Sequence, residues 1–308
     1  MSNVILITGA GTGMGRLAAR ALADAGHTVY ATMRHPEGRN AAKAADLLDY
    51  AAERDVDLRV VELDVLSQDS ADAAVANVIE QAGRLDVVVH NAAHLYYGVT
   101  EAFTSEQVLR AYDTNAVGAL RVNRAALPVL RRQGSGLLLW VGSGTSMVVP
   151  PFLAPYTAAK AAMDSLAESV SVEVARYGIE TSIVMPGPFT QGTAHFPNAE
   201  RAADDRVAAE YDKIADAIAN NGAATEALFA PGVVQDVLAV ADEIVRVVGL
   251  PHGERPYRTT VDFSDFGDVP VAAVAMAQRE RLLKRFGLDD VLKPATPVVQ
   301  GYPCRGTM

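Results

Sequence analysis

Short apolar runs alternate with amphipathic stretches along the first 190 residues of this chain. Residues 4–8 form a continuous β-rich apolar run, which is typical of a strand buried on both faces. From Leu17 to Ala25 apolar residues then recur at helical spacing, and Gly26 follows as a helix-stop residue. The same pattern predicts strands at 28–33, 58–63, 85–89, 137–141 and 181–185, and helices at 41–54, 70–82 and 109–130.

This alternation predicts the fold class. Strands and helices that alternate at such spacing form a parallel sheet covered by helices on both faces. We therefore expect an α/β fold with a doubly wound, Rossmann-like sheet in three α/β/α layers. No internal repeat interrupts the pattern, and no linker divides it before Pro186. A single domain over residues 1–265 is expected, followed by a C-terminal extension at 266–308.

The second half of the chain is less regular. Helices are predicted at 202–220 and 233–248, and an edge strand at 255–261. The extension contains an amphipathic basic helix at 274–286 and a proline-containing end. It is expected to pack either on the same domain or on a neighbouring subunit, and the sequence leaves both open.

Composition and charge exclude several classes of function. Half of the 308 residues are hydrophobic, and the net charge is −10, which disfavours nucleic acid and anionic membranes as partners. The single cysteine, Cys304, cannot form an internal disulfide, and the six histidines form no metal-binding motif. The first apolar run is too short for a signal peptide, and no run approaches the roughly 20 residues of a membrane span. We expect a cytoplasmic protein that binds no metal.

A glycine-rich segment, from Gly9 to Gly15, joins the first strand to the first helix. Glycines there allow backbone with positive φ and the close approach of a pyrophosphate, which meets the free N–H groups of the helix start. This context predicts a dinucleotide site, with an ordinary tight turn as the alternative. In such folds ligands bind at the carboxyl ends of the strands, where Asp64, Asn91, Ser143 and the pair Pro186-Gly187 also fall.

The residue that closes the second predicted strand is Arg34. An acidic residue at this place accepts a hydrogen bond from the 2′-hydroxyl of NAD, whereas an arginine pairs with the 2′-phosphate of NADP. The sequence therefore predicts a preference for NADP(H) over NAD(H). The alternative is that Arg34 is a solvated loop residue.

Tyr156 and Lys160 lie four residues apart at the start of a helix-favouring run. At that spacing they share one helical face, so a phenol and an ammonium point into the same cleft. A neighbouring cation favours the phenolate, so we expect a lowered pKa for Tyr156 and a role in proton transfer. Ser143, 13 residues upstream, follows a predicted strand and can hydrogen-bond the same substrate oxygen. An exposed helical Tyr/Lys pair is the alternative.

Taken in order, these residues resemble the short-chain dehydrogenase/reductase family, in its Rossmann-fold branch, over about residues 3–265. Thr8, Gly9, Gly13 and Gly15 match its TGxxxGxG motif, Tyr156 and Lys160 its YxxxK motif, and Asn115 and Ser143 the rest of its catalytic tetrad. The resemblance implies the following cofactor contacts: Thr8, Gly9, Gly13, Met14, Gly15, Arg34, Asp64, Val65, Asn91, Tyr156, Lys160, Pro186 and Gly187.

Two departures from the family pattern stand out. The family's NNAG segment reads His90-Asn91-Ala92-Ala93 here, which retains the asparagine but changes its neighbours. Gln191 stands where the family often has a threonine after Pro186-Gly187, with Thr190 and Thr193 nearby. Which hydroxyl, if any, reaches the cofactor is left open.

The resemblance implies an NADP(H)-dependent oxidoreductase that transfers a hydride between nicotinamide and a carbonyl or secondary alcohol. Tyr156 is implied as general acid/base, Lys160 as the cation that favours its ionisation and holds the nicotinamide ribose, and Ser143 as a donor to the carbonyl oxygen. Asn115 is implied to position a water. The expected reaction is reduction of a small-to-medium hydrophobic ketone or aldehyde. The alternatives are an oxidative dehydrogenase, an epimerase or dehydratase on the same scaffold, and a non-catalytic NADP(H) sensor.

The family places a variable substrate lid at about 189–231. Tyr96, Phe152, Phe189 and His195 are the expected substrate-lining residues, with ordinary loop packing as the alternative for each. The resemblance also implies a homodimer or homotetramer, formed through the helix at 109–130 and the helix that carries Tyr156.

Overall fold

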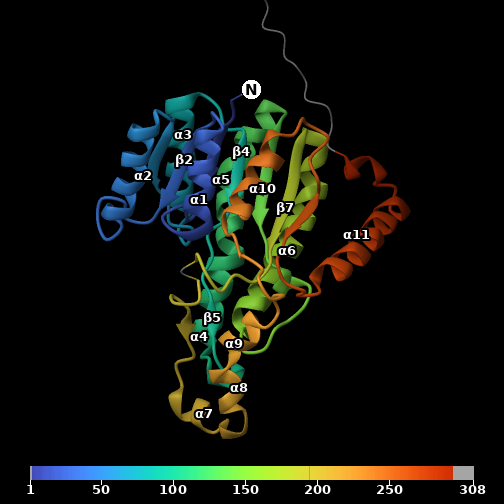
Figure 1. Cartoon of the computed structure of the whole chain (residues 1–308). Coiled ribbons are helices and arrows are strands. Elements are labelled where there is room, and N and C mark those ends of the chain that lie inside the picture. The colour runs from blue at the N-terminus through green and yellow to red at the C-terminus, as the bar shows by residue number, and fades with distance from the viewer. Residues whose placement is uncertain (1, 194, 294–308) are drawn as a thin grey trace, which may run out of the picture.

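A computed structural model describes residues 2–193 and 195–293 of the chain. Its centre is a seven-stranded parallel sheet with the order β3-β2-β1-β4-β6-β7-β9 (Figure 1). The strands are β1 (Val4–Ile7), β2 (Thr28–Met33), β3 (Leu58–Glu62), β4 (Val87–His90), β6 (Gly136–Val141), β7 (Ile179–Pro186) and β9 (Arg258–Val261). The predicted doubly wound α/β fold is confirmed.

Helices cover both faces of this sheet. One face carries α1 (Gly13–Asp24), α2 (Ala41–Arg54) and α10 (Leu238–Gly249), and the other carries α3 (Gln68–Ala82), α5 (Gly118–Gln133) and α6 (Ala154–Val174). Alternate residues of each strand feed the two cores, because successive strand side chains point to opposite faces. In β1, for example, Leu6 packs with the second group of helices, and Ile5 and Ile7 pack with the first.

The order of the strands sets the place of the site. From β1 the chain runs outward through β2 to β3, and then returns to continue from β4 on the other side of β1. Loops diverge at the carboxyl ends of β1 and β4, which is where doubly wound sheets bind ligands. The connection after β4 includes α4 (Ser105–Tyr112), which continues through the π-helical turn η2 (Asp113–Val117) into α5.

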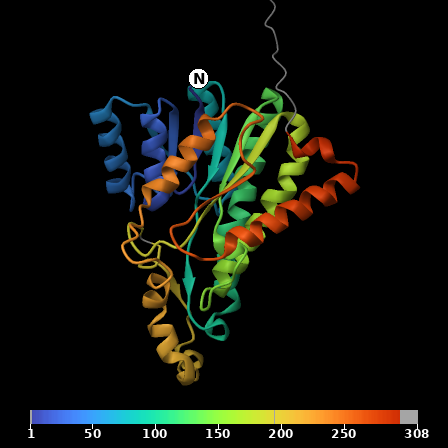
Figure 2. The ribbon, with the colours of Figure 1, turned by 45° about the vertical axis from the view of Figure 1, so that its right-hand side comes forward.

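An arm projects beyond the carboxyl edge of the sheet (Figures 1 and 2). It contains α7 (Asp205–Ala209), α8 (Ala215–Ala219) and α9 (Asn221–Glu226), with the 3-10 turn η5 (Asp212–Ile214) between the first two. The single helix predicted at 202–220 is therefore wrong. No residue of these short helices is buried, so there is no continuous apolar face to hold one long helix together.

A second, two-stranded parallel sheet ties this arm to the body. It pairs β5 (Tyr96–Tyr97) with β8 (Glu200–Arg201). The sequence pattern did not predict these strands, since two residues are too few to show a period. The sheet brings the loop after β4 against the start of the arm.

The C-terminal extension begins with α11 (Asp268–Arg285), six residues before the basic helix predicted at 274–286, and ends with the turn η6 (Asp289–Leu292). Within the chain it packs beside α6: Arg279 donates a hydrogen bond to the Ser171 hydroxyl, and Leu283 packs with Ala175 and Val291 (Figure 2). Helix α10 begins later than the predicted residue 233. The proline-containing end at 294–308, with Cys304, lies outside the described residues.

The sequence predicts neither a membrane-spanning helix nor a metal-binding group. Among the helices of the described residues, none combines the length and apolar character that crossing a bilayer requires. Within residues 2–193 and 195–293, His, Cys, Asp and Glu side chains form no group of three suited to a metal ion.

Candidate active site

A cavity of about 1050 Å³ extends along the carboxyl edge of the sheet, from the glycine loop to the arm. The predicted site residues that line it are Gly9, Gly13, Met14, Gly15, Arg34, Asp64, Val65, Asn91, Tyr96, Ser143, Tyr156, Lys160, Pro186, Gly187, Phe189 and His195. Residues predicted from distant parts of the sequence therefore share one cavity. Thr8, Asn115 and Phe152 do not line it.

The glycine loop is shaped by Thr8 and Asn91. The Thr8 hydroxyl accepts hydrogen bonds from the backbone N–H groups of Asn91 and Ala92, both at 3.0 Å, and the Asn91 amide donates to the carbonyls of Thr8 and Gly9. Gly9 has φ +67°, and a Cβ on Gly15 would lie 2.3 Å from Asn91 Nδ2. Neither position accommodates a side chain, so the loop keeps the bare backbone that a pyrophosphate needs.

His90, the first departure from the family pattern, points away from the cavity. It is buried with its Nε2 2.8 Å from Asn123 Oδ1, and its ring packs against Trp140 with centroids 4.3 Å apart. Burial lowers the pKa of His90 to about 4, so the imidazole is neutral at physiological pH. The histidine therefore supports the core beneath the sheet rather than the floor of the site.

The end of the cavity near β2 is rich in positive charge. Arg34, Arg39 and Lys43 all line it, and Asn40 lies among them. The Lys43 ammonium donates a hydrogen bond of 2.9 Å to the Asn40 amide oxygen, and the Asn40 amide donates to the Arg34 carbonyl. Arg34 was predicted from the sequence, but Arg39 and Lys43 were not, because their place in the cavity depends on how the start of α2 folds beside the end of β2.

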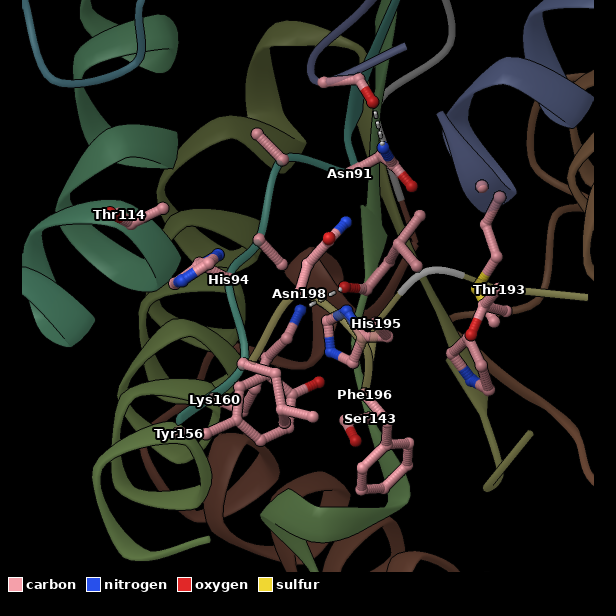
Figure 3. Close-up of a pocket in the computed structure, with 18 of the residues that line it drawn as sticks. Asn91, His94, Thr114, Ser143, Tyr156, Lys160, Thr193, His195, Phe196 and Asn198 are labelled. Carbon is pink, nitrogen blue, oxygen red and sulfur yellow. Dashed lines mark hydrogen bonds between the residues drawn. The ribbon is translucent and has the colours of Figure 1, made fainter. Parts of the chain in front are cut away.

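Ser143, Tyr156 and Lys160 lie close together at the other end of the cavity (Figure 3). Tyr156 and Lys160 are one turn apart on α6, Ser143 follows β6, and all three side chains are buried. The Lys160 ammonium donates a hydrogen bond of 2.9 Å to the Val141 carbonyl, which fixes it against the end of β6. A phenol, a hydroxyl and an ammonium thus face one space.

Burial controls the protonation of this group. It raises the pKa of Tyr156 to about 12, while hydrogen bonding to Ser143 acts in the opposite direction. The lowered pKa predicted for Tyr156 is therefore wrong for this structure, because the loss of solvation outweighs the hydrogen bond with Ser143. Burial also lowers the pKa of Lys160 to about 8, partly offset by Asp164. At neutral pH the phenol is protonated and most of the lysine is charged.

Asn115 lies in the π-helical turn η2 and is buried. Its amide oxygen accepts a hydrogen bond from the His94 N–H at 2.9 Å, and its amide nitrogen donates to the carbonyls of His94 and Ala111. The side chain is thus engaged with the backbone, and it holds the loop after β4 in place. The water-positioning role implied by the resemblance stays a prediction.

The substrate end of the cavity is formed partly by residues that lead into the arm, among them His195, Phe196 and Asn198 (Figure 3). The His195 ring meets the Tyr156 ring edge-on, with centroids 5.4 Å apart. Burial lowers the pKa of His195 to about 4, and the charges of Lys160 and His94 act in the same direction. His195 is therefore a neutral wall residue directly beside the phenol.

Of the two phenylalanines predicted at this end, Phe189 lines the cavity and Phe152 does not. Phe152 has φ +64°, and its ring packs against Tyr97, with centroids 6.4 Å apart, outside the cavity lining. Phe189 lines the cavity but also packs on Phe263 in the core. His94, Phe196, Asn198, Glu200 and Thr193 line it as well, so this end is more polar than an aromatic pocket.

The C-terminal segment also reaches the site. A Cβ on Gly187 would lie 2.2 Å from Asp262 Oδ1, so the backbone at Pro186-Gly187 rests directly on the residue that follows β9. Phe266 lines the cavity. No signal in the sequence marked either contact, because both depend on β9 lying next to β7.

A doubly wound sheet with a glycine loop and a Ser/Tyr/Lys cluster in one cavity defines a Rossmann-type, dinucleotide-binding class of protein. The chain belongs to the short-chain dehydrogenase family, whose model, described as short chain dehydrogenase, matches residues 3–204. Members of this family use NAD(H) or NADP(H).

Similar proteins include the 3-ketodihydrosphingosine reductase of Bacteroides thetaiotaomicron, 32% identical over 189 residues, or 61% of this chain and 65% of that protein. Human 17-beta-hydroxysteroid dehydrogenase type 1 is 37% identical over 192 residues, or 60% of this chain and 56% of that protein. The chain thus matches less than two thirds of the length of these relatives. A solved short-chain dehydrogenase from Streptomyces avermitilis has 26% identity and a TM-score of 0.70, covering 93% of this chain and 97% of that one.

Proposed function

We propose that this protein is an NADPH-dependent reductase that converts a ketone or aldehyde of moderate size to an alcohol. The observation that carries the proposal is that Ser143, Tyr156 and Lys160 line the same cavity as the glycine loop. The reductase named among the similar proteins supports the direction of the reaction.

The residues of the cavity fit a nicotinamide dinucleotide. The bare backbone at Gly9 and Gly15 accepts a pyrophosphate, Asp64 and Val65 border the adenosine end, and Pro186-Gly187 borders the end near Tyr156. When bound, the reduced cofactor supplies a hydride to the carbonyl carbon of the substrate.

The protein then handles the proton. Ser143 donates a hydrogen bond to the carbonyl oxygen, and Tyr156, protonated at neutral pH, gives its proton to the same oxygen as negative charge develops there. The nearby Lys160 ammonium stabilises the resulting phenolate. The carbon gains a hydride and the oxygen a proton, so the product is a neutral alcohol.

The cations at the β2 end support NADP(H) as the preferred cofactor. A 2′-phosphate placed there meets the guanidinium groups of Arg34 and Arg39 and the ammonium of Lys43. Between residues 34 and 43, the cavity is lined by Arg34, Arg39, Asn40 and Lys43, and none of these is acidic. The acidic residue at that end is Asp64, on the β3 side. Charge-assisted hydrogen bonds to phosphate are about twice as strong as neutral ones, so this cluster favours the phosphorylated cofactor.

The substrate end supports a carbonyl compound that carries a polar group as well as apolar surface. Tyr96, Phe196 and Leu153 offer apolar contact, whereas His195 and Asn198 offer hydrogen bonds. The same residues also serve a secondary alcohol in the oxidative direction, which the name of the human relative favours as the second candidate. Epimerase, dehydratase and sensor functions have no comparable support.

Two predictions beyond the site remain. A homodimer or homotetramer is supported by exposed apolar side chains near the start of α5, Val117 and Leu120. A cytoplasmic location stays a prediction. Light scattering of the purified protein measures the first, and fractionation of the producing cells the second.

A panel of ketones and aldehydes tests the proposed function. NADPH oxidation is followed at about 340 nm with each compound, and the matching alcohols are tested with NADP. We expect turnover with a subset of ketones. Tight NADPH binding without turnover on any carbonyl or alcohol would contradict the proposal and favour a sensor.

A further inference from the structure

Gln107, on α4, has a buried side-chain amide with all of its hydrogen-bonding capacity in use. Its Oε1 accepts from the backbone N–H groups of Thr104 at 3.2 Å and Ala203 at 3.0 Å. Its Nε2 donates to the Arg201 carbonyl at 2.8 Å and to the Glu200 carboxylate at 2.9 Å. The residue is 3% exposed. A buried amide can make four such bonds, so this one is completely satisfied.

Three of these four partners belong to one segment, residues 200–203, where the chain enters the arm. The same segment pairs with β5, and the Glu200 N–H donates to the Leu95 carbonyl at 2.9 Å. Just beyond it, the Asp204 N–H donates to the Ala102 carbonyl at 3.0 Å. Gln107 thus joins α4 to the base of the arm through its side chain, in addition to these backbone bonds.

The segment held by Gln107 leads directly into the substrate end of the cavity. Glu200 lines the cavity, as do His195, Phe196 and Asn198 just before it. Glu200 is also paired with Arg110, at 2.7 Å. Desolvation raises the pKa of Glu200, but hydrogen bonds from Gln107 and Arg110 outweigh it and lower the pKa, so the carboxylate is charged at neutral pH. If the base of the arm were not anchored, the Glu200 carboxylate and the cavity-lining segment 195–198, which places His195 beside Tyr156, would no longer be held in position.

We propose that Gln107 is a positioning residue for the substrate end of the cavity: it fixes the base of the arm, and through it Glu200 and the wall at 195–198. Gln107 does not line the cavity, so its action is indirect. The kinetic part of this inference rests on the proposed reductase function, whereas the structural part does not.

Gln107→Glu is the sharpest variant. The carboxylate keeps the acceptor for Thr104 and Ala203, but it loses both donors and faces the charged Glu200. With a ketone found in the panel, we expect the KM for the ketone to rise about tenfold, with the dissociation constant of NADPH unchanged within about twofold. The double variant Gln107→Glu/Glu200→Gln removes the repulsion, because the amide at position 200 can donate a hydrogen bond to the carboxylate at position 107. We expect its KM for the ketone to differ by less than about threefold from that of Glu200→Gln alone.

Gln133→Ala is the matched control. Gln133 also holds backbone with its amide, bonding to Leu85 N–H and C=O, but it lies on α5 and does not line the cavity. We expect this control to lower stability and to leave the ketone KM unchanged. An equal rise of KM in the control, or an unchanged KM in Gln107→Glu, would overturn the inference.

Hydrogen–deuterium exchange measures the anchoring without any turnover. The amides of Glu200, Ala203 and Asp204 are all bonded in this structure, and we expect them to exchange about tenfold faster in Gln107→Glu than in the unaltered protein. If no ketone is reduced but these amides lose protection, the reductase proposal fails and the anchoring stands. Unchanged protection in Gln107→Glu would overturn the anchoring whatever the enzyme does.

Discussion

At the scale of single residues, the site contains two buried ionisable groups, Tyr156 and Lys160, and burial shifts their pKa values in opposite directions. Burial holds Tyr156 protonated, with its pKa raised to about 12, and it makes Lys160 easier to deprotonate, with its pKa lowered to about 8. The phenol is therefore protonated over the whole physiological range. The lysine charge is the feature that changes with pH.

The first prediction concerns that charge. Lys160 is charged below its pKa and loses its proton as the pH rises through about 8, so the phenolate formed by Tyr156 loses its stabilising cation above that pH. We expect kcat/KM for ketone reduction to be level near neutrality and to fall about tenfold per pH unit well above pH 8. Initial rates between about pH 6 and 10 measure it, with NADPH binding determined at both ends as a control. A flat profile up to pH 10 would argue against a role for this lysine charge.

The second prediction concerns the cofactor. Arg34→Ala removes the guanidinium that we propose as a charge-assisted partner of the 2′-phosphate, and we expect kcat/KM for NADPH to fall about 10- to 100-fold. The value for NADH should change by less than about threefold, because NADH has no phosphate there. Lys43→Ala should act in the same direction.

Arg20→Ala is the control for that comparison. Arg20 is an arginine of the neighbouring helix α1 that pairs with Asp46 and does not line the cavity. It should leave both cofactors unaffected. Equal losses with NADPH and NADH in Arg34→Ala would show that the arginine does not read the phosphate.

At the scale of elements, the buried pair between β9 and α6 joins the edge of the sheet to the helix that carries Tyr156. Arg258 contacts both carboxylate oxygens of Asp164, at 2.7 and 2.9 Å, and both side chains are almost fully buried. Asp164 lies one turn after Lys160 on α6. The pair therefore holds α6 and the edge strand β9 in a fixed relation.

The third prediction follows from this burial. Arg258→Ala leaves the Asp164 carboxylate buried without its partner, and we expect the free energy of unfolding to fall by about 3–5 kcal/mol. Urea denaturation measures the change. Arg206→Ala is the control, because Arg206 forms an exposed pair with Glu210 and its loss should cost less than about 1 kcal/mol. A small loss in Arg258→Ala would mean that the buried pair contributes little.

The elements also show what the sequence could predict. Residues 4–7 are buried on both faces and show a continuous apolar run, whereas helix α3 buries one face and shows apolar residues at helical spacing. Both patterns can be recognised in the sequence. The alanine-rich pattern at 202–220 predicted one helix, but this part of the arm buries no helical face and forms two short helices, α7 and α8, with a 3-10 turn between them. The strands β5 and β8 depend on a long-range pairing that no local pattern contains.

The same distinction holds within the site. Tyr156, Lys160, Ser143 and the glycine loop have fixed spacings along the chain and were predicted. The positions of Lys43 in the cavity and of Gln107 beside the arm depend on how their helices pack. Phe152, at a backbone φ of +64°, packs on Tyr97 and does not line the cavity. Their contributions follow from tertiary contacts and could not be predicted from spacing.

At the scale of the whole molecule, one sheet edge collects the parts of the site. The glycine loop follows β1, Arg34 follows β2, the Asn115-held loop follows β4, Ser143 follows β6, and Pro186-Gly187 closes β7. The arm and the segment after β9 add lining residues to the cavity from outside the sheet, among them Thr225 and Phe266. A parallel sheet thus converts residues scattered over more than half of the chain into a single cavity.

The most direct test of the account is to compare Tyr156→Phe with the unaltered protein on a ketone from the panel. The substitution removes the hydroxyl alone from a buried ring, so the fold and the cofactor site should persist. We predict that ketone-dependent NADPH oxidation falls by at least about 100-fold while the dissociation constant of NADPH changes by less than about threefold. Reduction of the ketone at a rate close to that of the unaltered protein would contradict the claim that Tyr156 supplies the proton.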